Sequence, residues 1–246
     1  MARKILITGA SSGIGKALAF EMATRGYDVG LAARRTDELE KIKNDIKKES
    51  PERGVAVRKL DVTDYGDVPA AVTDVADDLG GLDIVFVNAG IGLGEAVGKG
   101  QFEKSLRTIQ TNLAGAMATI DASAAYFLEK GSGHIVGVAS VAAFRGMPRS
   151  ASYSASKAGL AIYLEALRAE THGKNIDITV LYPGYIDTPL NNMLKNRPFL
   201  ITVEKGAAII AKLIEKKATS STVPVFPWNI IGRLLKILPT GVIAKM

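Results

Sequence analysis

The sequence predicts an α/β fold in which helices cover both faces of a parallel sheet. Six short apolar runs alternate with segments of helical length, and 47% of the 246 residues are hydrophobic. Strands that are apolar on both faces are typical of parallel sheets in α/β proteins. No repeat, low-complexity segment or linker divides the chain, so we expect one doubly wound domain over residues 1–246.

The expected elements follow one another along the whole chain. Strands are expected at the runs KILITG, DVGLAAR, GVAVRKLDV, LDIVFVNAG, GHIVGVAS and DITVLYPG, and a seventh at STVPVF. Helices are expected over residues 14–25, 36–49, 65–79, 101–129, 151–171 and 203–217, with an irregularity near Asn112. Residues 185–202 carry prolines and asparagines without clean periodicity, which predicts a mobile lid over a site.

Composition narrows the functional classes. The absence of cysteine excludes disulfides and cysteine-ligated metals, and it fits a cytoplasmic location. No apolar run reaches the roughly 18 residues that span a bilayer. The net charge of +6 comes from Lys and Arg spread along the chain, so we expect no nucleic-acid partner. His134 and His172 lack a second ligand at metal spacing, so we expect no metal site and structural or solvent-exposed roles for both.

A glycine-rich turn connects the first strand to the first helix. The segment ILITGASSGIGKALAF passes through Gly9, Gly13 and Gly15. Glycines let the backbone approach a pyrophosphate closely, and the helix N-terminus presents unpaired N–H groups and the positive end of its dipole. Because a strand precedes this turn and a helix follows it, the motif predicts a dinucleotide-binding site.

The end of the second strand indicates which dinucleotide binds. A carboxylate at this point binds the ribose 2′-hydroxyl in NAD sites, whereas arginine favours the 2′-phosphate of NADP. Here Ala33 stands about where the acid would be, and Arg34 and Arg35 follow. Arginine can hold a phosphate through two charge-assisted hydrogen bonds. NADP is therefore favoured, with NAD as the alternative.

The motifs together resemble those of one known family. TGASSGIG at 8–15, VNAG at 87–90, YSASK at 153–157 and YPGYIDT at 182–188 occur in family order, with Asn112 and Ser140 between them. In this set the chain resembles the short-chain dehydrogenase/reductase (SDR) family, in its subtype of chains of about this length. The resemblance implies a Rossmann-like fold with a seven-stranded parallel sheet, hydride transfer to or from a nicotinamide, and a homodimer or homotetramer.

The resemblance also assigns roles to individual residues. Tyr153 would be the catalytic acid/base and Lys157 its activator, Ser140 would bind the reacting oxygen, and Asn112 would support a proton-relay water. Asp61 and Val62 resemble the adenine-side contacts, and Thr188 resembles the residue that holds the carboxamide. The cofactor-binding set is Gly9, Ser11, Ser12, Gly13, Ile14, Gly15, Arg34, Arg35, Asp61, Val62, Asn88, Ala89, Gly90, Tyr153, Lys157, Pro183, Gly184, Ile186 and Thr188.

Two positions depart from the family pattern. The family often has Asn where this chain has Val87, which touches no chemistry. Members that use NADP often carry a basic residue before the second glycine of the turn, where this chain has Ser12. The NADP prediction therefore depends mostly on Arg34.

The spacing of Tyr153 and Lys157 suits the assigned chemistry. A free tyrosine titrates near roughly pH 10, too high for a base at neutral pH. Residues four apart on a helix share one face, so the Lys157 ammonium would stabilise the phenolate and lower the Tyr153 pKa by about two to three units. In reduction, Tyr153 would donate a proton while Ser140 stabilises the charge growing on the carbonyl oxygen.

The C-terminal segment, residues 227–246, leaves two alternatives open. Ile231, Leu234, Leu235 and Leu238 recur at helical spacing, with Arg233 and Lys236 among them and Trp228 leading in. The segment either packs into a subunit interface or over the substrate pocket, or residues 227–240 lie on an anionic membrane surface.

The sequence as a whole favours an NADP-preferring oxidoreductase that interconverts a carbonyl (ketone or aldehyde) and a secondary alcohol. Pocket walls are expected from residues 91–98, 141–149 and 185–200, whose composition suggests an apolar small-molecule substrate. The alternative is a catalytically silent dinucleotide-binding sensor or scaffold of the same fold.

Overall fold

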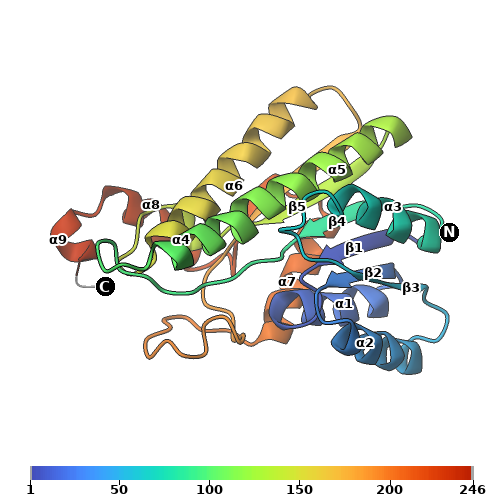
Figure 1. Ribbon diagram of the computed structural model, residues 1–246, viewed down its shortest axis with the longest axis horizontal. Helices are drawn as coiled ribbons and strands as arrows, with labels where there is room; N and C mark the ends of the chain where they lie inside the picture. The colour runs from blue at the N-terminus through green and yellow to red at the C-terminus, as the bar shows by residue number, and fades with distance from the viewer. Residues whose placement is uncertain (1, 245–246) are drawn as a thin grey trace.

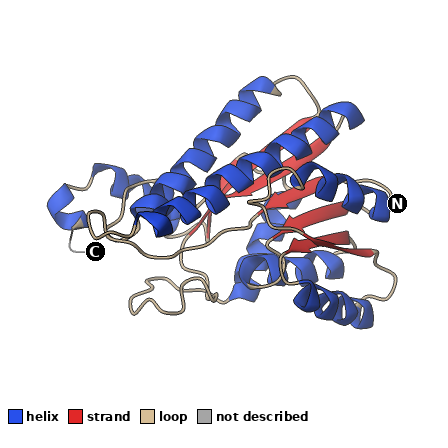
Figure 2. Cartoon of the chain, viewed as in Figure 1, coloured by secondary structure: helices blue, strands red, loops and turns tan. Residues whose placement is uncertain are grey.

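The computed structural model describes residues 2–244 and contains one seven-stranded parallel sheet between two layers of helices (Figures 1 and 2). Residues 1 and 245–246, which belong to the predicted domain and tail, lie outside the described part. The strand order is β3-β2-β1-β4-β5-β6-β7. The strands are β1 (Lys4–Thr8), β2 (Asp28–Ala33), β3 (Val55–Lys59), β4 (Ile84–Val87), β5 (Gly133–Val138), β6 (Ile176–Pro183) and β7 (Ser220–Val223). The predicted doubly wound, Rossmann-like fold is confirmed.

Each face of the sheet has its own hydrophobic core, because the strands are apolar on both sides. On one face, α3 (Val68–Leu79), α5 (Gly115–Lys130) and α6 (Ala151–Glu170) pack around Phe127, Leu160 and Leu164. On the other face lie α1 (Gly13–Thr24), α2 (Thr36–Glu49) and α7 (Val203–Glu215), around Leu18, Met22 and Ile210. The sheet is therefore buried on both faces, and the loops at its carboxyl edge start from well-packed strands.

The strand order reverses direction between β1 and β4, which are neighbours although three helices and two strands separate them in the chain. Open α/β sheets bind their ligands at such a switch point, outside the carboxyl ends of the strands. The loops after β1, β4, β5 and β6 all meet at this edge. The fold therefore brings together the segments that carry the predicted motifs.

The irregularity expected near Asn112 is a π-helical turn. Helix α4 (Phe102–Ile109) continues through π-helical residues Gln110–Ala114 into α5. Such turns insert an extra residue into the helical ladder and occur frequently at functional sites. Helices α4 and α5 therefore form one continuous helical segment with a π-helical turn at Asn112.

The last part of the chain differs from the prediction in one strand and adds two helices. β7 ends at Val223 because Pro224 has no N–H to donate to the ladder, so the expected run to Phe226 is too long. Helices α8 (Trp228–Ile237) and α9 (Thr240–Ile243) follow at one end of the molecule (Figure 1). Within residues 2–244, no helix combines the length and apolarity that crossing a bilayer requires.

Candidate active site

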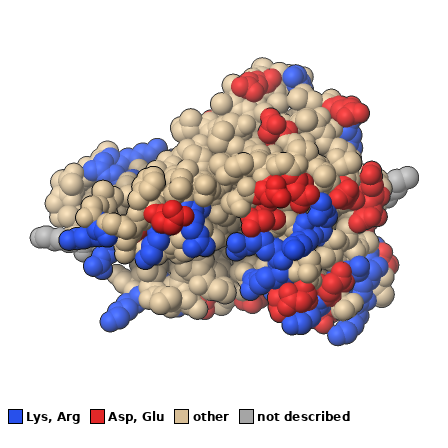
Figure 3. Space-filling model, in the orientation of Figure 1, with Lys and Arg blue, Asp and Glu red and all other residues tan. Residues whose placement is uncertain are grey.

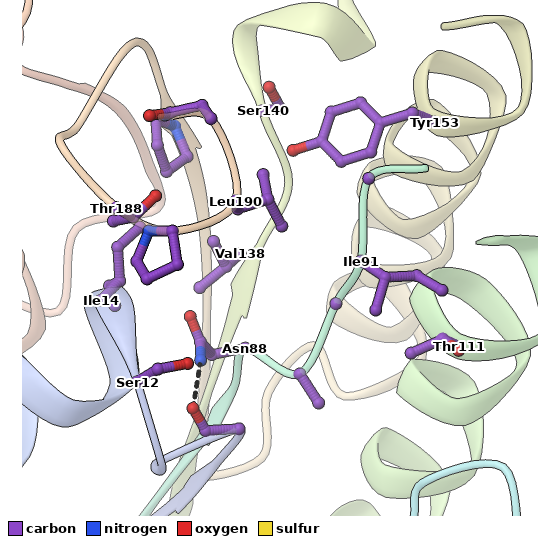
Figure 4. A pocket seen from close by; sticks show the side chains of 18 of the residues that line it. Ser12, Ile14, Asn88, Ile91, Thr111, Val138, Ser140, Tyr153, Thr188 and Leu190 are labelled. Carbon is purple, nitrogen blue, oxygen red and sulfur yellow. Dashed lines mark hydrogen bonds between the residues drawn. The ribbon is translucent and has the colours of Figure 1, made fainter. Parts of the chain in front are cut away.

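A cleft of about 760 Å³ opens at the carboxyl ends of β1, β4, β5 and β6. It gathers residues that are far apart in the sequence, and Figure 4 shows their side chains converging on one space. Of the predicted site residues, all but Gly15 and Asn112 line this cleft. The lining ones are Gly9, Ser11, Ser12, Gly13, Ile14, Arg34, Arg35, Asp61, Val62, Asn88, Ala89, Gly90, Ser140, Tyr153, Lys157, Pro183, Gly184, Ile186 and Thr188.

Two glycines of the glycine-rich turn leave no room for a Cβ. Gly9 has a φ of +68°, and a Cβ there would meet the Cα of Ala89 at 2.9 Å. A Cβ on Gly15 would lie 2.5 Å from the carbonyl oxygen of Gly9. Gly15 therefore serves the approach of α1 to the turn and does not line the cleft, whereas Gly9 does both.

Thr8 and Asn88 bind the turn to the loop after β4. The Thr8 hydroxyl donates to the carbonyl of Phe86 and accepts from the backbone N–H groups of Asn88 and Ala89 at 3.1 and 3.3 Å. The Asn88 side-chain amide donates to the carbonyl of Thr8 at 2.9 Å. Two loops that meet at the switch point are thereby held as one unit. Thr8 is a supporting residue that the sequence prediction missed.

Arg34 and Arg35 sit at the adenosine end of the cleft with different partners. Arg35 donates to the hydroxyl of Ser11 at 3.0 Å, so it is committed to the turn. Arg34 is 65% exposed and lies 3.8 Å from the carboxylate of Asp61. Burial would raise the pKa of Asp61, but hydrogen bonds from Thr63 and the charge of Arg34 outweigh it and lower that pKa. Among the described residues Arg34 donates no hydrogen bond, so its guanidinium has more donors left for a ligand than that of Arg35.

Ser140 and Tyr153 bring their hydroxyls to the middle of the cleft (Figure 4). Ser140 directly follows Ala139 at the end of the β5 segment, and its hydroxyl accepts from the N–H of Ala142, which fixes the start of a short 3₁₀ turn. Tyr153 lies in the first turn of α6. Burial raises the pKa of Tyr153, and the neighbouring Ser140 hydroxyl offsets this effect only in part. The arrangement offers a proton donor and a second hydrogen-bond donor to one substrate oxygen.

Lys157 is buried beneath Tyr153 and donates to the carbonyl of Val138 at 2.8 Å. Its Nζ lies 5.9 Å from the centre of the Tyr153 ring. Burial lowers the pKa of the ammonium to about 8. Lysine and tyrosine therefore share one face of α6, as predicted.

The predicted direction of the Tyr153 pKa is wrong for the protein alone. Burial raises that pKa, and this effect exceeds the opposing hydrogen bond from Ser140. Lys157 does not reverse it, because its ammonium is bound to the Val138 carbonyl and stays 5.9 Å from the centre of the phenol ring. The phenol is therefore held protonated, which suits a proton donor better than a base.

Asn112 lies outside the cleft and is fully buried in the π-helical turn. Its side-chain oxygen accepts from the N–H of Ile91 and its amide donates to the carbonyl of Ile91, both at 2.8 Å. The observed role is therefore to hold the loop after β4. The assignment of a relay water to Asn112 stays a prediction.

The substrate end of the cleft was only partly predicted. Residues 91–94 and 186–194 contribute to its walls, as expected for two of the three segments. The third, 141–149, lines no part of it, because Phe144 stacks on Tyr182 at 4.7 Å between ring centroids and packs under α8. Lining residues that were missed altogether are Leu60, Thr111, Val138 and Ala139.

The segment predicted as a lid, residues 185–202, packs against the tail. An isolated bridge between Ile186 and Ile201 joins the two ends of this segment. Trp228 of α8 contacts Tyr185 and Phe199 of the lid, each with 5.9 Å between ring centroids. Its indole lies against Gly184, where a Cβ would come within 2.1 Å. Helix α8 therefore packs against residues 184–199 without lining the cleft, and the alternatives for the tail stay predictions.

The cradle fits a dinucleotide. A Cβ on Gly13 would meet nothing closer than 3.4 Å, so this glycine leaves space at the cleft. The N-terminus of α1 lines that space with Gly13 and Ile14, and Arg34 offers a positive charge farther out. The described residues 2–244 contain no group of three or more His, Asp or Glu side chains that could hold a metal.

Comparisons with known proteins agree with this geometry. A family profile described as short chain dehydrogenase matches residues 3–198. An uncharacterized oxidoreductase of Mycobacterium tuberculosis is 40% identical over 238 residues, which are 96% of this chain and 94% of that protein.

Solved structures extend the agreement to the fold. A variant of actinorhodin polyketide ketoreductase with NADPH is 26% identical, with a TM-score of 0.81 over 90% of this chain and 95% of that one. A short chain dehydrogenase/reductase from Burkholderia phymatum in complex with NAD is 21% identical and has a TM-score of 0.85, over 95% and 92%, which shows the shared fold.

Fold, cleft and family profile converge on one assignment. A nicotinamide dinucleotide is the cofactor, and the substrate is a small molecule. The chain belongs to the short-chain dehydrogenase/reductase family of NAD(P)-dependent oxidoreductases.

Proposed function

We propose that this protein interconverts a carbonyl and a secondary alcohol with NADP(H) as its preferred cofactor and Tyr153 as its acid/base. The observation that carries the proposal is the position of the Tyr153 and Ser140 hydroxyls in one cleft, with Lys157 buried beneath them. A bound nicotinamide dinucleotide supplies or accepts the hydride in such a site.

The residues of the chain handle the proton and the oxygen. In reduction, Tyr153 gives its phenolic proton to the substrate oxygen while the Ser140 hydroxyl donates a hydrogen bond to the same atom. The Lys157 ammonium then stabilises the phenolate that remains. This stabilisation opposes the effect of burial, which raises the Tyr153 pKa and so disfavours the phenolate. In oxidation the same proton returns to Tyr153.

Replacing the phenol tests the proposal. Tyr153→Phe removes the proton donor and should lower kcat for ketone reduction by about 10²- to 10⁴-fold, measured as NADPH consumption over a panel of ketones and aldehydes. Tyr163→Phe, on the same helix but off the cleft, is the matched control and should retain activity. A wild-type protein that binds NADPH yet reduces nothing in the panel would favour a silent sensor or scaffold instead.

Arg34 supports the preference for NADP. It is largely exposed at the adenosine end, and its contact with Asp61 is long, so its guanidinium can turn to a 2′-phosphate. Arg34→Asp should reverse the ratio of kcat/KM values for NADPH and NADH in favour of NADH. Equal kinetics with both cofactors before and after the change would contradict the preference.

An apolar substrate fits the exposed end of the cleft. Leu190, Met193 and Leu194 line it and face outward as well, and Ile91 and Leu93 form the opposite wall. One structural neighbour is named a polyketide ketoreductase, and that name supports reduction of a carbonyl as the direction. We expect the best substrates in the panel to be apolar ketones.

We also propose a homodimer or homotetramer in the cytoplasm, with the tail end of each subunit able to contact a membrane surface. Phe102, Leu128 and Ile162 leave apolar side chains exposed on neighbouring helices, which suits self-association. The outer face of α8 exposes Ile230, Leu234 and Ile237 beside Arg233 and Lys236.

Charge favours an anionic membrane over a second copy at the tail. Residues 216–244 contain no Asp or Glu, and Figure 3 shows basic and uncharged surface at this end, with most of the visible acidic side chains over the other half. Two copies would bring like charges together, whereas anionic lipid attracts them. Ile237→Glu should abolish flotation with phosphatidylserine vesicles, and Ile162→Glu should not. If the wild type does not float with the vesicles, the proposed membrane contact is wrong. Sedimentation of both variants measures their oligomeric state.

A further inference from the structure

The loop after β4 carries a buried carboxylate outside the cleft. Glu95 is 3% exposed, and among the described residues it and Lys157 are the two buried side chains of the types Asp, Glu, Lys and Arg. Glu95 contacts Ser152, and Lys157 lies one turn later in α6, so the two flank Tyr153 along the start of that helix. A buried charge is costly unless polar groups compensate it, so its partners decide what it does.

Glu95 caps the catalytic helix from a separate loop. Its Oε1 accepts from the N–H of Ser152 at 2.7 Å and from the Ser152 hydroxyl at 2.6 Å. Ser150, the residue at the capping position of α6, makes no capping bond with its own side chain. A carboxylate at this place satisfies an orphan N–H and complements the positive end of the helix dipole. The residue so held is the immediate neighbour of Tyr153.

The backbone of Glu95 fastens the same two segments. Its N–H donates to the carbonyl of Arg149 at 3.0 Å, and a parallel bridge pairs it with Ser150. At the other end of this short loop, Asn112 holds both polar groups of Ile91. Between the two anchors, a Cβ on Gly92 would lie 3.9 Å from the Tyr153 ring. The loop of residues 91–95 is therefore fixed at both ends and passes beside the Tyr153 ring at Gly92.

We propose that Glu95 is a positioning residue for the reaction, which acts through Ser152 to hold Tyr153 against the wall of residues 91–95. The inference rests on the proposed role of Tyr153. The second oxygen, Oε2, is buried and has no hydrogen-bond partner among the described residues, so the hydrogen bonds of this carboxylate all go to Ser152, the neighbour of Tyr153. A shift of about 1 Å at a reacting group can reduce the rate by about 10²-fold.

Three variants separate positioning from bulk stability. Glu95→Ala removes both contacts to Ser152 and should lower kcat by about 10- to 100-fold with little change in KM for NADPH. Glu95→Gln keeps an oxygen for Ser152 and should restore kcat to within about threefold of wild type. Glu103→Gln, an exposed acid in the following helix, is the matched control and should behave as wild type.

The pH profile supplies a readout that a merely structural role would not move, and amide exchange reports the helix cap itself. Glu95→Ala should shift the Tyr153-dependent limb of kcat/KM, since the phenol would move relative to Ser140 and Lys157, and Glu95→Gln should not. Amide hydrogen exchange at the start of α6 should be faster in Glu95→Ala than in Glu95→Gln or Glu103→Gln, whether or not kcat changes. If Glu95→Ala does not fold, Ser152→Ala takes its place, because it removes one of the two donors to Oε1.

The outcomes distinguish the inference from the proposed function. If Tyr153→Phe is inactive while Glu95→Ala keeps wild-type kcat, pH profile and exchange rates, the positioning role is overturned and the function stands. If kcat in Glu95→Ala falls only in proportion to the folded fraction, the positioning role is overturned as well. If Tyr153→Phe retains full activity, the proposed function fails, and the exchange measurement still decides whether Glu95 holds the helix.

Discussion

The cofactor end and the substrate end of the cleft are built in different ways. At the cofactor end, Gly9 and Gly15 touch neighbouring backbone and Thr8 and Asn88 exchange hydrogen bonds, so few positions tolerate a larger side chain. At the substrate end, Met193 is 91% exposed and Leu190 and Leu194 are about half exposed. The difference indicates that the binding of the shared dinucleotide is fixed by backbone packing, whereas substrate choice depends on side chains that can change at little cost to the fold.

The strongest way to break this contrast is to place a methyl group in the glycine turn. Gly9→Ala adds a Cβ at 2.9 Å from backbone at a φ of +68°. We expect a loss of about 2–5 kcal/mol of stability and of NADPH binding, from conformational strain and overpacking together. Denaturant unfolding and a fluorescence titration with NADPH measure both.

Gly98→Ala is the control for conformational strain alone. Gly98 has a φ of +78° but nothing within 4 Å of the added Cβ. We expect a loss of about 1–2 kcal/mol and unchanged cofactor binding. Equal effects of the two substitutions would mean that close packing does not set the cofactor end apart.

A buried histidine in the sheet, away from both ends of the cleft, makes the stability of the fold depend on pH. His134 is 1% exposed, and its Nε2 lies 2.8 Å from the hydroxyl of Thr179. Burial lowers its pKa to about 4 from 6.5. As the pH falls through this window the unfolded chain takes up the proton first, so stability decreases from about pH 6.5 to about pH 4.

The decrease in stability that protonation of His134 causes can be measured by comparing the wild type with His134→Gln. His134→Gln should lack about 3 kcal/mol of the acid destabilisation that the wild type shows over this window. Urea unfolding at pH 7 and pH 4 gives the difference, with exposed His172→Gln as control. Parallel loss of stability in all three proteins would show that His134 titrates normally.

The smallest effect is expected in the lid. Arg197 donates to the carboxylate of Asp187 and to the side-chain oxygen of Asn191, and so ties the lid to its base. Arg197→Gln should raise KM for the carbonyl substrate about threefold and change stability by less than about 0.5 kcal/mol. A loss of stability comparable to that of Gly9→Ala would mean that the lid is part of the core.

The sequence was informative where function depends on short-range pattern. The glycine turn, Ser140, and the pair Tyr153 and Lys157 all lie at the cleft, because each is fixed by a local strand end or helix face. The helix over residues 36–49 was predicted with its observed bounds, since its apolar positions recur at one period.

What could not be predicted depends on contacts between distant segments. Glu95 and Ser152 are 57 residues apart, and no local pattern pairs them. The wall expected from 141–149 was misplaced because Phe144 packs against Tyr182 and Gly232. The direction of the Tyr153 pKa likewise depends on burial, which helix spacing does not reveal.

The loop beyond Glu95 has a practical consequence. After the carboxylate the chain turns outward, Val97 is 83% exposed, and Gly98 and Gly100 have open space around them. The whole chain contains no cysteine. A single Val97→Cys substitution would therefore give one attachment point for a fluorescent dye, two residues from the anchored wall and outside the cleft, from which binding at the substrate end could be followed in real time.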